Sequence, residues 1–271
     1  MRRSCVNIAC GDSYVAGWLN FDYVPHSPHV IQADLLKRLP AGSDSADVIY
    51  SSHFLEHVPR ALVMKLLSEC FRITKRGGRV RLVLPDLEEM CRAYLAARER
   101  GEHDKADFLV LELLDQCVRI KPGGELGDFY ERLQSAPARS NEMIEFVRQR
   151  TGHEFQPFVE ATGARWKRVL GNPGYLFGRL QGLYCMLVLA LLPSAFRKQN
   201  VSLASVGERH AWIYDFHSIE KLLKQAGFTD IRRVTASTSS IDGFPFSLLD
   251  VTNEGLPRKG LESMYIEAVK P

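Results

Sequence analysis

Residues His53–His57 match the pattern H-x-x-E-H, in which two histidines bind zinc from one face of a helix. Such a site needs both imidazoles on the same helical face, together with a third ligand and a base. The apolar run DVIY at 47–50 precedes this motif and predicts that residues 51–53 end a strand instead. We therefore expect no metal ligands here, and we expect His57 to tether the loop to the following helix.

Acidic residues follow three other predicted strands. Asp12 comes after the first strand, Asp22 ends the second and Asp34 ends the third. Ligands of open parallel sheets bind at the carboxyl ends of strands. The first loop lacks G-x-G-x-x-G, and the carboxylate of Asp12 would repel a phosphate. Each acid taken alone also fits an ordinary turn. Together they favour a cationic ligand without phosphate, such as S-adenosylmethionine, with Asp22 on the ribose and Asp34 on the adenine.

Short strands and a helix must position these residues. The extended segments are residues 5–10, 18–23, 30–35, 46–51 and 79–85. Residues 62–73 have helical spacing, and we expect Gly77 and Gly78 to stop that helix after a basic last turn. Strands that alternate with helices imply a parallel sheet with helices on its faces.

The second half of the chain divides differently. Residues 87–205 show helical periodicity and little strand pattern, so we interpret them as a helical insertion that forms a lid, an acceptor pocket or a contact between subunits. Residues 1–86 and 206–271 then form the core. In residues 206–271 we expect a helix at 218–226, which Ser218 or a neighbour caps and Gly227 ends. We also expect strands at 230–236 and 263–269.

The chain resembles class I S-adenosylmethionine-dependent methyltransferases of the type 11 group. The resembling stretches, in the family's order and spacing, are VNIACGD, GWLNFD, IQADLLKRLP, DSADVIYSSHFLEHV and LLSECFRITKRGGRVRLVLPDLE. The stretch HAWIYDFHSIEKLLKQAGF and the ending resemble a subgroup linked to polysaccharide or glycan biosynthesis. The resemblance implies a Rossmann-like α/β fold, with a seven-stranded, mostly parallel sheet whose last strand is antiparallel.

The resemblance also assigns roles to residues. The expected cofactor-binding residues are Ala9, Cys10, Gly11, Asp12, Asp22, Tyr23, Asp34, Leu35, Ser51 and Ser52. Methyl transfer from a sulfonium needs mainly alignment of the reactants, but a hydroxyl acceptor also needs a base. His53 and His210 are the candidates for that base. Asp86 we expect to cap the following helix.

One departure from the family concerns the short connection between the first two strands, residues 11–20, which leaves little room for the usual helix. The chain also begins close to the first strand. We therefore expect one face of the sheet to be thinly covered, and the insertion or a second subunit to fill that gap.

Composition excludes several classes. The net charge of +3 does not demand a nucleic-acid partner, and six scattered cysteines indicate a reducing cytoplasm without a disulfide framework. The longest apolar run, residues 183–192, is too short to cross a bilayer. The basic and apolar stretch 164–200 could lie at a membrane interface, but a buried lid helix or a homodimer contact is favoured.

These observations predict a methyltransferase that acts on a hydroxyl of a small molecule or glycan. Two alternatives stay open. One is a non-catalytic relative that uses the fold as a binding module. The other is a zinc hydrolase that uses the H-x-x-E-H residues.

Overall fold

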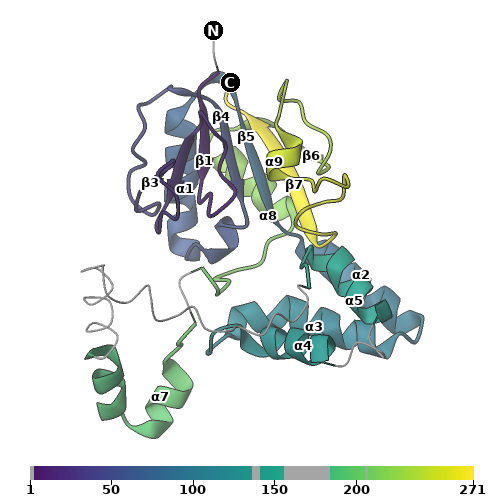
Figure 1. Ribbon diagram of the computed structural model, residues 1–271. Coiled ribbons are helices and arrows are strands. Elements are labelled where there is room, and N and C mark those ends of the chain that lie inside the picture. The colour runs from purple at the N-terminus through teal and green to yellow at the C-terminus, as the bar shows by residue number, and fades with distance from the viewer. Residues whose placement is uncertain (1–2, 136–140, 156–183, 205–206) are drawn as a thin grey trace.

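A seven-stranded sheet forms the centre of the computed structural model, which describes residues 3–135, 141–155, 184–204 and 207–271 (Figure 1). The strand order is β3-β2-β1-β4-β5-β7-β6. The strands are β1 (Cys5–Ile8), β2 (Leu19–Asp22), β3 (Val30–Gln32), β4 (Ala46–Ser52), β5 (Thr74–Pro85), β6 (Thr229–Val234) and β7 (Ser263–Val269).

The pairing of the strands confirms the predicted fold class. The neighbouring strands from β3 through β5 pair in parallel, and β7 lies antiparallel to both β5 and β6. This is a Rossmann-like α/β sheet with a reversed last strand. Because the first five strands run in one direction, their carboxyl ends share one edge of the sheet, which points toward the helical part of the molecule in Figure 1.

The helices cover one face of the sheet and also form a separate layer. They are η1 (Leu55–His57, a 3-10 turn), α1 (Arg60–Ile73), α2 (Leu87–Glu99), α3 (His103–Val118), α4 (Gly124–Ser135), α5 (Asn141–Thr151), α7 (Ser194–Asn200), α8 (Phe216–Gln225) and α9 (Phe246–Leu249). Buried side chains at helical spacing on α1 and α8, including Leu67 and Leu223, pack with the sheet residues Ile49 and Ile266 in the main core.

The end of α1 differs from the prediction. The helix ends at Ile73, and β5 begins at the next residue, so the glycines do not stop the helix. Gly77 has a φ of +74°, and Gly78 packs so closely against Thr74 that a Cβ there would overlap it. The register of β5 against β4 shifts at this point. The glycines therefore allow an irregularity at the start of β5.

The helix predicted at 218–226 is α8, which begins two residues earlier than predicted, at Phe216, and ends at Gln225, before the predicted stop at Gly227. The backbone N–H of Ser218 donates to the carboxylate of Asp215 at 2.7 Å, which makes Asp215 the N-cap. Gly227 follows the helix with a φ of +102°, a conformation that favours glycine. β7 has the predicted bounds.

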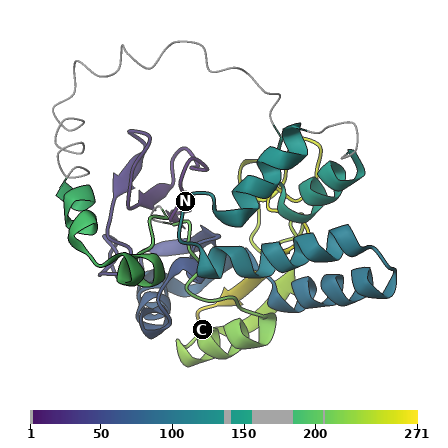
Figure 2. The ribbon, with the colours of Figure 1, turned by 90° about the horizontal axis from the view of Figure 1, so that it is seen from below.

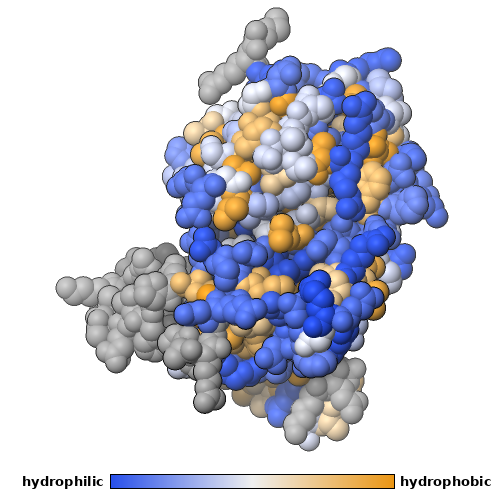
Figure 3. All heavy atoms as spheres, turned by 90° about the vertical axis from the view of Figure 1, so that its right-hand side faces the viewer, coloured by the Kyte–Doolittle hydropathy of each residue, from blue (hydrophilic) through white to orange (hydrophobic). Residues whose placement is uncertain are grey.

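The second face of the sheet is covered differently from our expectation. Residues 9–18 connect β1 and β2 through turns, without a helix. The connection between β6 and β7 covers the face instead, with Ile241, Phe244 and Leu249 packed against Tyr50 and Tyr265 of the sheet. The gap is filled by residues 235–262 of the core, and neither the insertion nor a second subunit is needed for it. The side of the molecule that lies to the right in Figure 1 exposes mostly hydrophilic side chains, with small apolar groups between them (Figure 3).

A buried ion network fastens this connection to the sheet. The Arg81 guanidinium on β5 is fully buried and lies 2.7 Å from carboxylate oxygens of both Asp250 and Glu267. It also donates to the backbone oxygens of Thr235 and Thr238. Since every charge in the network has partners, its burial does not leave an isolated ion.

The helices α2 to α5 lie beyond the carboxyl edge of the sheet (Figures 1 and 2). The end of α5 is fastened to the chain that leads into β7, because the N–H of Glu262 donates to the carbonyl of Arg150 at 3.0 Å. The contact is close, since a Cβ at Gly260 would overlap that carbonyl. Arg150 in turn forms ion pairs with Glu89 on α2 and Glu112 on α3. The division of the chain into a core and an insertion remains our proposal.

Much of the basic and apolar stretch 164–200 lies outside the described residues. Its described part contains a helix at 184–191 and α7. Several large apolar side chains in this part are exposed, among them Met186, Leu187 and Leu191. None of the described helices is both long enough and apolar enough to cross a membrane.

We expect Arg81→Ala to lower the free energy of unfolding by about 3–5 kcal/mol, because it leaves two buried carboxylates without their cation. Denaturant unfolding followed by circular dichroism measures this. Arg76→Ala, at an exposed position on the same strand, is the matched control. A loss for Arg81→Ala no larger than that for the control would show that the network does not hold the two layers together.

Candidate functional site

The carboxyl ends of β1, β2 and β4 bring most of the predicted cofactor residues together. Ile8 pairs with both Phe21 on β2 and Ser51 on β4, so the chain after Ile8 lies between the ends of the other two strands. The N–H of Cys10 donates to the carbonyl of Phe21 at 3.2 Å, which holds the first loop against β2. From β1 the sheet continues to β2 and β3 on one side and to β4 and β5 on the other, so the strand order reverses at β1. Open parallel sheets bind ligands at such a point.

Asp22 fixes the shape of the first loop. Its carboxylate accepts hydrogen bonds from the N–H of Gly11 at 2.8 Å and from the N–H of Val24 at 3.0 Å. A carboxylate offers about four lone-pair directions, so two remain for the hydroxyls of a ribose. The geometry is therefore compatible with the predicted role of Asp22.

Strained backbone marks two neighbouring strand ends. Ala9, just after β1, has a φ of 56°, and His53, just after β4, has a φ of 48°. Residues other than glycine rarely adopt this left-handed conformation, and such residues gather at binding and catalytic sites. The strain at both positions supports a functional site between the ends of β1 and β4.

The other predicted cofactor residues differ in their surroundings. Ser51 is buried, and its hydroxyl donates to the carbonyl of Ile8 at 3.1 Å, so it joins two strands. Ser52 is the last residue of β4. Cys10 is buried next to the loop, and burial raises the pKa of its thiol to about 11, so the thiol stays protonated at neutral pH. Asp12 and Tyr23 are exposed.

The residues predicted to contact the adenine follow β3. Asp34 forms an ion pair with Lys37 at 3.1 Å, and the hydrogen bond from that lysine lowers the pKa of the Asp34 carboxyl. Its carboxylate also accepts from the N–H of Leu36, which makes a local turn. Leu35 is buried in the main core. Both residues are thus engaged within the chain, and their contact with a cofactor stays a prediction.

The two base candidates come together beside the loop after β4. His53 points its Nδ1 at a carboxylate oxygen of Glu56, 3.3 Å away. His57 packs edge-on against His210, with ring centroids 4.9 Å apart. The segment around His210 is held there by the N–H of Ala211, which donates to the carbonyl of Glu56 at 2.6 Å, and by the N–H of His210, which donates to the carbonyl of Gln116 on α3.

Burial sets the charge of this group. Burial raises the pKa of the Glu56 carboxyl to about 8 and lowers the pKa of His210 to about 3. Burial also lowers the pKa of His53 well below its usual value, and it lowers the pKa of His57 below the usual value of a histidine. All three imidazoles are therefore neutral at pH 7. His57 is partly buried, as predicted, but its Nδ1 donates to the carbonyl of Arg209 at 2.8 Å, so it tethers the loop to the segment before α8 and not to the following helix.

Two acidic residues near the candidate site have structural roles. Asp86 caps α2 by accepting from the N–H of Glu88 at 3.1 Å, as expected. Asp215 caps α8, and His217 is almost fully exposed. Glu56 and Ser263 are members of the site that sequence reasoning gave no role of their own. Nothing in the spacing links them, because Ser263 stands about two hundred residues further along the chain.

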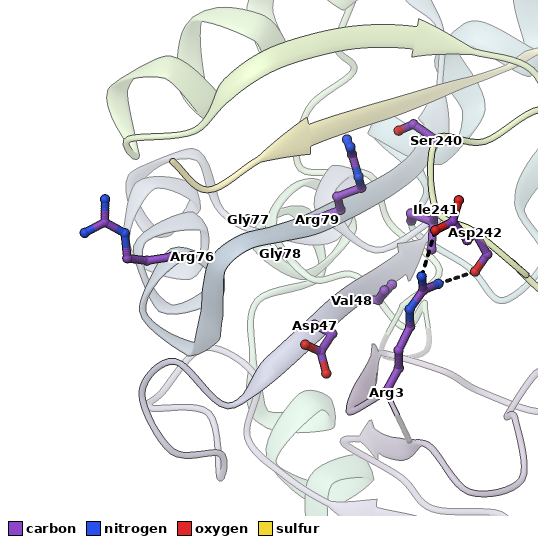
Figure 4. Close-up of a pocket in the computed structure, with 10 residues that line it drawn as sticks. All are labelled: Arg3, Asp47, Val48, Arg76, Gly77, Gly78, Arg79, Ser240, Ile241 and Asp242. Carbon is purple, nitrogen blue, oxygen red and sulfur yellow. Dashed lines mark hydrogen bonds and ion pairs between the residues drawn. The ribbon is translucent and has the colours of Figure 1, made fainter. Parts of the chain in front are cut away.

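A cavity of about 390 Å³ lies at the other end of the sheet, between the starts of β4 and β5 (Figure 4). Arg3, Arg76 and Arg79 line it, and Arg3 forms an ion pair with Asp242. The cavity faces away from the carboxyl ends of the strands, so it does not coincide with the candidate site.

Comparison with known proteins bears on this site. A family model described as a methyltransferase domain matches residues 15–82, the segment that supplies β2 to β4, α1 and most of β5. No curated protein matches the sequence significantly.

Several solved structures have low similarity to the chain. An S-adenosylmethionine-dependent methyltransferase from Thermotoga maritima, described as a possible histamine N-methyltransferase, is 11% identical over 100% of this chain and 83% of its own, with a TM-score of 0.41. One from Archaeoglobus fulgidus is 11% identical over 99% and 86%, with a TM-score of 0.40. One from Mesorhizobium loti is 21% identical over 34% and 50%, with a TM-score of 0.27. At these scores, the family match is the comparison that bears on function, and S-adenosylmethionine is the cofactor that it implies.

We expect Asp22→Ala to weaken the binding of S-adenosylhomocysteine at least about tenfold. The change removes the acceptor of two ribose hydroxyls and the anchor of the Gly11 loop, and hydrogen bonds to a charged group contribute about 1.5–3 kcal/mol each. Isothermal titration calorimetry measures the affinity.

The matched control is Asp47→Ala at the opposite end of the sheet. Asp47 also accepts from a backbone N–H, that of Ser4 at 2.7 Å, and pairs with Lys75. The Asp47→Ala variant should bind S-adenosylhomocysteine with the same affinity as the unaltered protein. Equal affinities for all three proteins would remove Asp22 from the cofactor site.

Proposed function

We propose that the protein is an S-adenosylmethionine-dependent methyltransferase that methylates a hydroxyl of a small molecule or glycan. The observation that carries the proposal is the methyltransferase-domain match over residues 15–82. That segment builds the strand ends where Asp22, Ser52 and His53 lie.

The cofactor fits the charges at these strand ends. Asp12 and Asp22 place carboxylates at the loop that follows β1, which lacks the G-x-G-x-x-G pattern that holds a pyrophosphate. A sulfonium and an ammonium group are attracted to such carboxylates, whereas phosphates are repelled. We propose that the methionine end of the cofactor lies along Ala9 to Asp12.

The acceptor would approach from the helical side of the edge. In Figure 1, α2 and α5 lie next to the end of β5, and His210, beside the loop after β4, donates its N–H to the carbonyl of Gln116 on α3. We propose that these helices form the acceptor pocket and restrict the entry of water. The exposed apolar side chains at 184–191 make a peripheral membrane contact or a homodimer contact of this part a further proposal.

His53 and His210 are proposed as the groups that accept the proton of the hydroxyl. Both imidazoles are neutral at pH 7 because burial lowers their pKa, so each has a free lone pair. A low pKa also makes each imidazole a weak base, so transfer of the proton would accompany formation of the new bond to carbon.

Methyl transfer itself is tested by incubating the protein with S-adenosylmethionine and a panel of alcohols, phenols and glycosides. We expect S-adenosylhomocysteine to accumulate with at least one acceptor, as measured by mass spectrometry. Binding of S-adenosylhomocysteine without turnover on any hydroxyl acceptor would speak against a hydroxyl acceptor and favour a binding module.

For an acceptor found in this way, we expect His53→Asn or His210→Asn to lower kcat by about 10²-fold or more, the usual contribution of a base. The affinity for S-adenosylhomocysteine should change little. His217→Asn, at an exposed position, is the control. If kcat is unchanged in both variants, neither imidazole acts as the base.

A further inference from the structure

Four titratable side chains lie close together beside the loop after β4. One ligand atom each from Glu56, His57 and His210 lies within 4.8 Å of the other two. The fourth group, Nδ1 of His53, lies 3.3 Å from an oxygen of Glu56. The positions of the protons on these four groups decide what the cluster can hold.

Hydrogen bonds outside the cluster fix the protons of two rings. The Ser263 hydroxyl donates to the carbonyl of Lys259 at 2.9 Å, so it must accept from Nε2–H of His53 at 2.8 Å. That leaves a lone pair on Nδ1 of His53, which points at Glu56. His57 donates its Nδ1–H to the carbonyl of Arg209 at 2.8 Å, which leaves the lone pair on Nε2.

Three buried polar atoms of the cluster make no hydrogen bond to the described part of the chain. Glu56 is fully buried, and neither of its carboxylate oxygens accepts a hydrogen bond from a described residue. Nδ1 of His210 is also buried and makes no hydrogen bond among the described residues. Lys259 is the cation whose charge reaches Glu56, but the two form no ion pair in this part of the structure. Without a partner the buried Glu56 carboxyl holds a proton, as its raised pKa indicates, unless a cation replaces that proton, and the ring nitrogens of His57 and His210 beside it are ligands for such a cation.

We propose that Glu56, His57 and His210 form a binding site for a divalent transition-metal ion of the zinc class. Two imidazoles and one carboxylate are ligands that suit Zn²⁺, Mn²⁺ or Fe²⁺ better than Mg²⁺. The bond from His57 to the carbonyl of Arg209 is the contact that commonly orients a metal-binding histidine. With metal–ligand bonds of about 2.1 Å, tetrahedral ligands stand roughly 3.4 Å apart, so the three side chains need to close by about an ångström.

This site differs from the zinc helix that the H-x-x-E-H pattern describes. His53 lies before the 3-10 turn with left-handed backbone, and its outer nitrogen is bound to Ser263, so it does not share a helical face with His57. The ligand that takes its place, His210, comes from the chain segment before α8. His53 borders the site as a neighbour of Glu56. With the ion bound, His210 acts as a ligand, and His53 is the imidazole of the proposed pair that is left to act as the base.

Three protein ligands leave one coordination position open, as in catalytic zinc sites. A hydroxyl bound there loses its proton more readily, because the cation stabilises the oxyanion. This role rests on the proposed methyl transfer to a hydroxyl, and it would compensate for the weakness of the nearby imidazoles as bases. Binding of the ion itself does not depend on that role.

The test is titration of the full chain, first stripped of metal with a chelator, with Zn²⁺ and with Co²⁺ as a spectroscopic probe. We expect one equivalent to bind with micromolar or tighter affinity, with Mg²⁺ a poor competitor. Glu56→Gln and His210→Asn should each weaken binding at least about tenfold. His217→Asn, which changes an exposed imidazole, should bind as the unaltered protein does.

Two results would overturn the proposal. One is the absence of stoichiometric binding to the unaltered protein, which would mean that Glu56 is held by a proton instead. The other is unchanged affinity in both ligand variants. If a variant fails to fold, as judged by circular dichroism, X-ray absorption of the unaltered Co²⁺ complex decides by showing or lacking imidazole scattering. Titration with S-adenosylhomocysteine in excess chelator tests the cofactor site separately, so the two proposals can fail independently.

Discussion

The hydrogen bond between the Asp22 carboxylate and the N–H of Gly11 connects the ends of two neighbouring parallel strands, and the candidate site is built around it. It gives the loop after β1 a fixed shape without a glycine-rich phosphate cradle. It also leaves a carboxylate at the point where the strand order reverses. A nucleoside with a cationic tail suits this arrangement of acceptors, whereas a dinucleotide does not.

The rest of the molecule holds this edge in place from two sides. Below the sheet, α5 is fastened to the chain before β7 by the contact of Gly260 with the Arg150 carbonyl. On the second face of the sheet, Arg81 fastens the connection between β6 and β7. This connection covers the face, because no helix lies between β1 and β2. The loop after β4 lies where these parts meet, and there Glu56 and His210 are brought together although the insertion separates them in sequence.

The strands and their edge were predictable because local patterns encode them. Short extended runs followed by acids predicted β1, β2 and β3, the apolar run DVIY predicted β4, and the seven-stranded sheet followed from the resemblance. The end of α1 was not predictable from its glycines, because close packing of Gly78 on Thr74 gives them a different role. The cover of the second face depends on long-range packing of Phe244 and Leu249. The proximity of Glu56 and His210 is likewise tertiary, so the spacing H-x-x-E-H could not indicate it.

The most direct test of the account is a crystal structure of the protein with S-adenosylhomocysteine. We predict that the ribose lies on Asp22, the amino-acid end along Ala9 to Asp12, and the sulfur toward the loop after β4. A ligand found elsewhere, for example in the arginine-lined cavity at the opposite end of the sheet, or a candidate site that stays empty at saturating ligand, would contradict the account.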